Sequence, residues 1–227
     1  MRTSLFYSLR QLKPALRKRR STIRSFADKL GFAYLGTMHQ HDDEYDPIRG
    51  FTASTSHRDT HYAVGSYEGF DIRIVDRFDV QKTHSRKHGQ PQSWTILEFT
   101  LEVRDIPHTI FVPTGKNSAD YERVFSANIH MQPLNSILQR TNHSARLYGR
   151  YQILARPTHS RSVESLLTSP IIFGIGEKLW PFGLELDNNT LDIYRSTSRI
   201  TEEQLSAACI SGMWLANEIN RSPITSP

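Results

Sequence analysis

Residues 93–103 read SWTILEFTLEV, a stretch that decides the fold because apolar and polar residues alternate along it. The alternation slips once, at positions 97 and 98, and its apolar members are Trp94, Ile96, Phe99, Leu101 and Val103. A period of two residues is typical of a strand that buries one face of a sheet. Residues 94–103 are therefore predicted to form a β-strand.

Shorter stretches of the same kind lie on both sides of it. We expect strands at residues 32–35, 51–55, 62–65, 71–75 and 109–112. An acidic, histidine-containing loop at 39–47, a polar turn at 57–60 and a polar loop at 81–93 separate them. Short connections of this kind favour an antiparallel meander.

The second half mixes strands with helices. A strand at 148–154 precedes a helix that starts near Ser162, is interrupted at Ser169–Pro170 and resumes over 171–179. Strands at 182–186 and 190–194 form a hairpin, and Thr201–Gln204 is a capping box that opens a helix to about Asn220. The predicted class is α+β, with a basic N-terminal helix, an antiparallel meander and then strand, helix, hairpin and helix. The predicted division is an arm over 1–30, one domain over 31–220 and a frayed tail over 221–227.

The positive charge is concentrated in the first 30 residues. They hold nine of the 28 Lys and Arg and one acid, a local charge of +8, whereas the whole chain is +5. The remaining residues therefore sum to −3, which indicates that only the arm attracts anions. Cys209 is the single cysteine, so a disulfide within the chain is excluded. No apolar run reaches the ~20 residues that span a bilayer, and we expect no transmembrane segment.

The arm also has helical periodicity. Apolar residues recur in steps of three and four, with Arg19 in the one slot that lacks an apolar residue; they are Leu5, Leu9, Leu12, Leu16, Ile23, Phe26 and Leu30. Proline is favoured at the first helical position and glycine just past the last, so the helix is predicted from Pro14 to Leu30, before Gly31. The bases expected to bind an anionic partner are Arg17, Lys18, Arg19, Arg20 and Arg24.

Four interpretations of this arm remain open. Its apolar stripe could dock on the body and leave the bases solvated, or the bases could bind an anionic membrane surface. Nucleic acid is a third partner, disfavoured because no aromatic residue lies within the basic run to stack on bases. A targeting segment is the fourth. Deletion of residues 1–30 is expected to leave the body folded.

The order of elements resembles an uncharacterised family of small bacterial proteins found in Saccharibacteria and their relatives. The segments that carry the resemblance are FAYLGT (32–37), VGSYEGFDIRIVD (64–76), SWTILEFTLEV (93–103), YGRYQILA (148–155), SVESLL (162–167) and FGLELDNNTLDIYRS (182–196). Members often carry transmembrane helices ahead of this domain, whereas this chain has only the basic arm. The resemblance implies a cytoplasmic setting near the inner face of a membrane, and it implies no activity.

Candidate chemistry in the body is sparse. His39, His41 and Asp43 form an H-x-H-x-D string that resembles a metal-binding motif, but an antiparallel meander does not supply the further ligands, and a solvated loop is the alternative. Four carboxylates could form an acid/base pair at the edge of the meander: Asp76, Asp79, Glu98 and Glu102. Cys209, within the last predicted helix, is expected to be buried and inert.

The sequence thus predicts a non-enzymatic accessory or interaction domain without a cofactor, placed by its arm at an anionic membrane surface or an acidic protein partner. A sequence-independent nucleic-acid-binding protein and an enzyme of unknown class are the alternatives.

Overall fold

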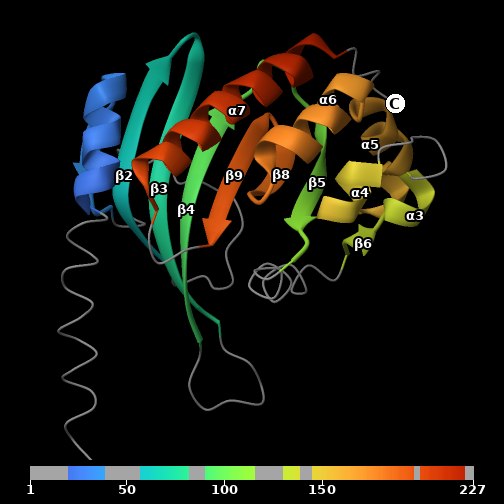
Figure 1. The fold of residues 1–227 in the computed structure, drawn as a ribbon, viewed down its shortest axis with the longest axis horizontal. Helices are drawn as coiled ribbons and strands as arrows, with labels where there is room; N and C mark the ends of the chain where they lie inside the picture. Colours follow the sequence, from blue (N-terminus) through green and yellow to red (C-terminus); the bar gives the residue numbers. More distant parts are fainter. Residues whose placement is uncertain are drawn as a thin grey trace, which may run out of the picture.

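The computed structural model describes residues 20–38, 57–81, 90–115, 130–138, 145–196 and 200–222. Within these residues, the chain forms one antiparallel sheet with helices packed on it (Figure 1). The α+β class predicted from the sequence is therefore confirmed. Among the described helices, none is both long enough and apolar enough to cross a bilayer.

Nine strands pair in the order β1-β2-β3-β4-β9-β8-β5-β7-β6 within the described residues. They are β1 (Ala33–Gly36), β2 (Arg58–Tyr67), β3 (Phe70–Gln81), β4 (Gln90–Thr100), β5 (Ile106–Pro113), β6 (Gln132–Pro133), β7 (Tyr151–Ala155), β8 (Gly183–Asn188) and β9 (Thr190–Ser196). β1 to β4 form the predicted meander. β5 does not continue it, because the hairpin of β8 and β9 pairs between β4 and β5.

Several strand boundaries differ from the sequence prediction. β2 begins within the predicted polar turn at 57–60. β3 extends beyond residue 75, and β4 begins within the predicted polar loop at 81–93. The turn signal corresponds to a bulge, because the pairing of β2 with β3 shifts between Thr60 and Ala63 and His61 has a φ of 58°. A bulge bends a strand without ending it. The predicted strand at 51–55 lies outside the described residues.

The helices follow the same chain order as expected, with additions. One helix covers residues 20–30. The others are α3 (Asn135–Leu138), α4 (Ala145–Arg150), η1 (Pro157–His159), α5 (Ser160–Leu166), α6 (Ser169–Gly174), η2 (Ile175–Leu179) and α7 (Glu202–Arg221). η2 is a single π-helical turn that continues α6. Thr201 caps α7 through the predicted capping box, with its side chain accepting from the Gln204 amide.

The helices cover one face of the sheet, which we call the helix face (Figure 1). Side chains of β3, β4, β8 and β9 on this face, such as Ile74, Phe99, Leu184 and Ile193, belong to one apolar cluster with the helices. The alternate residues point to the opposite, second face, where Val75, Ile96, Tyr194 and others form a smaller apolar cluster. The sheet is thus buried on both faces along its centre.

Candidate functional site

Helix 20–30 docks its apolar side on the edge of the sheet. Ile23, Phe26 and Ala27 are buried in the main apolar cluster, and the Lys29 ammonium pairs with Glu202 at the start of α7. Figure 1 shows this helix beside β2. Over these residues, the body therefore covers the apolar stripe of the arm. This agrees with the first of the four interpretations, in which the stripe docks on the body.

The bases of this helix remain in solvent. Arg24 is about 60 % exposed, lies 4.0 Å from the Asp28 carboxylate and has its guanidinium 5.9 Å from the centre of the Tyr34 ring. Arg20 is exposed at the described start of the helix. Arg17, Lys18 and Arg19 lie outside the described residues. The binding of an anionic partner by these five bases stays a prediction.

The metal candidates of the sequence, His39, His41 and Asp43, also lie outside the described residues. Among the residues that the structure does describe, no three His, Cys, Asp or Glu side chains are arranged to hold a metal ion. Cys209 is buried in α7, and burial, aided by the charge of Glu68, raises the pKa of its thiol to about 11. A thiol with a raised pKa carries little of the thiolate that acts as a nucleophile.

The four carboxylates proposed as an acid/base group do not lie together in the structure. Asp76 lies on the helix face, where it accepts a hydrogen bond of 2.6 Å from the Thr95 hydroxyl. Glu98 lies on the second face, and Glu102 is exposed beyond the end of β4. Asp79 of β3 is opposite Gln92 in the pairing with β4, and Gln92 lies six residues before Glu98 along β4. The predicted grouping is therefore wrong, although Glu98 belongs to a different one.

A row of ionisable side chains crosses the second face, perpendicular to the strands. Strand pairing aligns Arg73 with Glu98, Glu98 with Asp192, and Asp192 with Glu185. His108 of the next strand ends the row. We call these residues the ionisable row: Arg73, Glu98, Asp192, Glu185 and His108. They come from β3, β4, β9, β8 and β5, of which β4 and β9, and β8 and β5, become neighbours only in the folded sheet.

Each end of the row is a base that pairs with a buried acid. Arg73 donates to Glu98 at 2.6 Å, and His108 Nε2 lies 2.6 Å from Glu185 Oε1. Tyr194 donates to Glu185 Oε2 at 2.5 Å and also lies 3.4 Å from Asp192 Oδ2. The three acids are between 2 and 7 % exposed. The acids are thus buried, whereas the two bases at the ends are partly exposed.

Asp192 lies at the centre of the row, between two other carboxylates. Burial raises its pKa well above the ordinary value, and the charges of Glu98 and Glu185 raise it further, against smaller opposite effects of Arg77 and Tyr194. Its Oδ1 is buried and makes no hydrogen bond. A buried carboxyl between two carboxylates favours its protonated form. Asp192 therefore holds a proton up to a higher pH than an exposed aspartate does.

The pKa of His108 is also raised, but by a different balance of burial and neighbouring charge. Burial lowers it, but the hydrogen bond and the charge of Glu185 outweigh burial and raise the pKa above its ordinary value. Protonated His108 then neutralises one of the three acids. Two members of the row, His108 and Asp192, therefore keep a proton to a higher pH than their exposed counterparts do.

A second ion pair lies next to the row on the same face. Arg77 donates from Nε and Nη2 to the two carboxylate oxygens of Asp59, both at 2.8 Å, with the two side chains almost fully buried. His57 lies 3.7 Å from the same carboxylate. Two parallel bonds of this kind fix the relative position of β2 and β3.

Sequence reasoning missed the ionisable row because each member looks ordinary in its own strand. Glu185 and Asp192 occupy the polar positions of "LEL" and "LDI", which predict a solvent-facing side of a hairpin. Only the insertion of that hairpin between β4 and β5 brings these acids beside Glu98 and His108. No local pattern in the sequence predicts that pairing.

The fold places the chain in a class of α+β proteins that have one broad antiparallel sheet covered by helices on a single face. No protein-family model matches the sequence, and no curated protein is significantly similar to it. Among solved structures, the fold is similar to the crystal structure of the mycobacterial trehalose monomycolate transport factor A, TtfA. The TM-score is 0.60 at 8 % identity, over 93 % of this chain and 99 % of that one. The likeness shows a shared fold across nearly the whole of both chains.

Proposed function

We propose that this chain is an accessory protein that is held at an anionic membrane surface by the bases that precede helix 20–30 and by those on its exposed side. The observation that carries the proposal is the docking of helix 20–30. Because Ile23, Phe26 and Ala27 are buried against the body, the helix is fixed in place with its apolar side covered and Arg20 and Arg24 on its exposed side. The similarity in fold to a transport factor supports an accessory role connected with transport.

Electrostatics sets the strength expected of such a contact. Each base near an anionic leaflet contributes about 1 kcal/mol, so the three bases that precede Arg20 contribute on the order of 3 kcal/mol together. This corresponds to on the order of a hundredfold in affinity. Salt screens charges that stay in solvent, and the binding is therefore expected to weaken as ionic strength rises.

The test is flotation of the full chain with phosphatidylcholine vesicles that contain or lack phosphatidylglycerol, across a salt series. The variant Arg17→Gln, Lys18→Gln, Arg19→Gln is expected to bind the anionic vesicles on the order of a hundredfold more weakly at low salt. The matched control Arg58→Gln, Arg104→Gln, Arg221→Gln removes the same charge from three exposed positions elsewhere and is expected to bind nearly as wild type.

Two results would contradict the proposal. One is equal binding by the two triple variants, because the effect would then follow total charge and not the arm. The other is tighter, salt-dependent binding of duplex DNA than of vesicles in a parallel filter assay, which would assign the bases to nucleic acid instead.

A further inference from the structure

Exposed apolar side chains lie on α6, at the end of η2 and on α7, three elements that contact one another. Of the five large exposed apolar residues that the structure describes, Phe173, Trp180 and Ile210 belong to these elements or their ends. Phe173 and Ile210 are the most exposed, at 62 % and 64 %. A scattered surface leucine needs no explanation, but apolar side chains concentrated in one region mark an interaction site.

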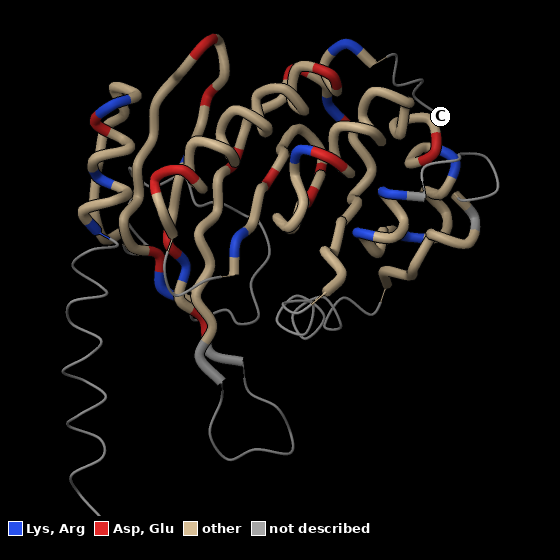
Figure 2. Tube along the Cα trace, in the orientation of Figure 1, with Lys and Arg blue, Asp and Glu red and all other residues tan. Residues whose placement is uncertain are grey.

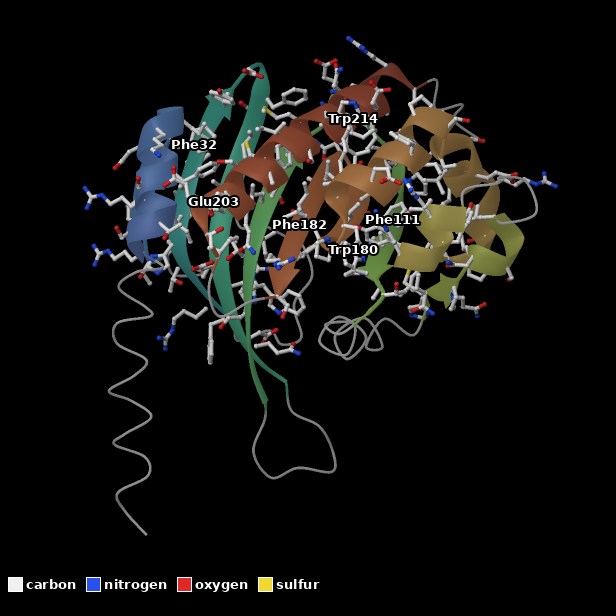
Figure 3. The ribbon with its side chains drawn as sticks, viewed as in Figure 1. Phe32, Phe111, Trp180, Phe182, Glu203 and Trp214 are labelled. Atoms are coloured by element: carbon white, nitrogen blue, oxygen red, sulfur yellow. The ribbon has the colours of Figure 1, made fainter. Side chains whose placement is uncertain are left out.

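Trp214 of α7 packs on α6, the helix that carries Phe173. Gly174, which follows Phe173 in α6, lies so close to the indole that a Cβ there would be 1.8 Å from Trp214 Cη2. Ile210 is one helical turn before Trp214 on α7, and residues four apart are neighbours on a helix surface. Figure 3 shows Trp214 on α7 next to α6. We call Phe173, Lys178, Ile210 and Trp214 the aromatic–basic surface.

Cations lie on both tryptophans of this region. Lys178 Nζ is 4.2 Å from the ring centre of Trp214, and the Arg150 guanidinium is 5.4 Å from that of Trp180. Trp180 is labelled in Figure 3 at the end of η2, so the aromatic residues occupy both sides of this π-helical turn. Tryptophan with a neighbouring cation is the combination that settles at the headgroup level of a membrane.

The surrounding segment is basic although the body as a whole is not. Residues 145–180 hold five bases, Arg146, Arg150, Arg156, Arg161 and Lys178, against Glu164 and Glu177, a local charge of +3. Arg146 and Arg150 lie on α4, Arg161 on α5 and Lys178 on η2, whereas Arg156 lies between β7 and η1. Figure 2 draws the positions of Lys and Arg along the chain in blue. Glu177 is paired with Arg146, and Glu218 bounds the surface one turn beyond Trp214. A local excess of bases therefore also lies outside the arm.

We infer that the aromatic–basic surface is a second contact of the chain with an anionic lipid bilayer, in which Phe173 and Ile210 insert among the lipids and Lys178 faces the headgroups. The inference rests on the proposed function, since it names a further contact with the same partner. It differs in mechanism, because the arm contributes charge alone whereas this surface contributes apolar area. Removal of its apolar side chains should weaken binding even at a salt concentration that screens the arm.

The experiment compares two double variants of the full chain on vesicles of phosphatidylcholine and phosphatidylglycerol. Phe173→Ser, Ile210→Ser removes the two exposed side chains and is expected to weaken binding at least about tenfold. Leu35→Ser, Phe78→Ser is the matched control, because these residues are 48 % and 42 % exposed on β1 and β3, and it is expected to bind as wild type. Tryptophan quenching by brominated lipid gives a second readout, expected for wild type and reduced in Phe173→Ser, Ile210→Ser.

Each outcome separates this inference from the proposed function. Binding lost in Phe173→Ser, Ile210→Ser but kept in the triple variant of the arm supports the inference and contradicts the function assigned to the arm. Binding that is lost in the triple variant of the arm but kept in Phe173→Ser, Ile210→Ser contradicts the inference alone. An equal loss of binding in the control Leu35→Ser, Phe78→Ser also contradicts it. Failure of wild type to bind either kind of vesicle overturns both. Thermal unfolding of each variant, expected within about 0.5 kcal/mol of wild type for exposed positions, shows that the fold is retained.

Discussion

Asp192 has an environment very different from that of an exposed aspartate. It is buried between Glu98 and Glu185, and its Oδ1 has no hydrogen-bond partner. Burial and the two neighbouring carboxylates hold its pKa well above the ordinary value. The unfolded chain therefore releases this proton at a lower pH than the folded protein does, and ionisation favours unfolding over the interval between the two pKa values.

This gives a prediction for Asp192→Asn. Asparagine cannot ionise, so the variant should be more stable than wild type at neutral pH, by at least about 1 kcal/mol. The gain should shrink toward zero as the pH falls to about 4, the ordinary pKa of aspartate. Urea unfolding at both pH values measures it. Asp71→Asn, at an exposed position of β3, is the control and should show no such growth with pH. A gain in stability for Asp192→Asn that is equal at both pH values would contradict the raised pKa of Asp192.

At the scale of elements, the contact between α6 and α7 depends on the absence of a side chain. Gly174 allows the Trp214 ring to lie against the backbone of α6, and Ser211 of α7 bonds to the Lys178 carbonyl of η2. The indole thereby holds α7 against α6. Glycine has low helix propensity, so its presence in α6 indicates a packing requirement.

The matching prediction compares two glycines that both lie in helices. Gly174→Ala places a Cβ 1.8 Å from the Trp214 ring and should destabilise the protein by about 1–3 kcal/mol, because the ring has to move. Gly149→Ala in α4 meets no atom within 4 Å and should be neutral or stabilising by up to about 1 kcal/mol. Thermal unfolding gives the stabilities, and a red shift of tryptophan emission is expected only for Gly174→Ala. Equal effects of the two changes would show that propensity, and not the contact with Trp214, governs α6.

For the whole molecule, the N-terminal helix belongs to the packed core. The sequence led us to expect that deletion of residues 1–30 leaves the body folded, but Ile23, Phe26 and Ala27 are at most 4 % exposed. Gly65 of β2 also touches Phe32, next to this helix, so the edge of the sheet is built around it. Removal of the helix would expose one edge of the main apolar cluster.

Two truncations test this. A chain that begins at Arg20 should unfold at nearly the wild-type temperature. A chain that begins at Gly31 should lose roughly 3–6 kcal/mol, because two large buried side chains, Ile23 and Phe26, are removed. Calorimetry of both proteins measures the difference. A chain beginning at Gly31 that retains wild-type stability would show that the helix is a separate arm.

Local patterns of the sequence were sufficient for several individual elements. β1, the hairpin of β8 and β9, and the capped helix α7 lie close to where alternation and the Thr201 capping box predict them. These signals are local, because a period of two or of 3.6 residues and a cap are set by neighbours along the chain. Helix α4 was missed, since residues 148–150 read as part of the strand that follows.

The sequence by itself therefore determined the class of the protein, the alternation of its strands, the capped helix and the concentration of charge in its first 30 residues. The tertiary structure alone decided which strands are neighbours, and with that the ionisable row, the covered side of helix 20–30 and the aromatic–basic surface. The physical reason is that pairing between distant strands and helices depends on burial and shape across the whole chain. A residue such as Asp192 is polar and unremarked in its own strand, and becomes a buried, proton-holding group only beside Glu98 and Glu185.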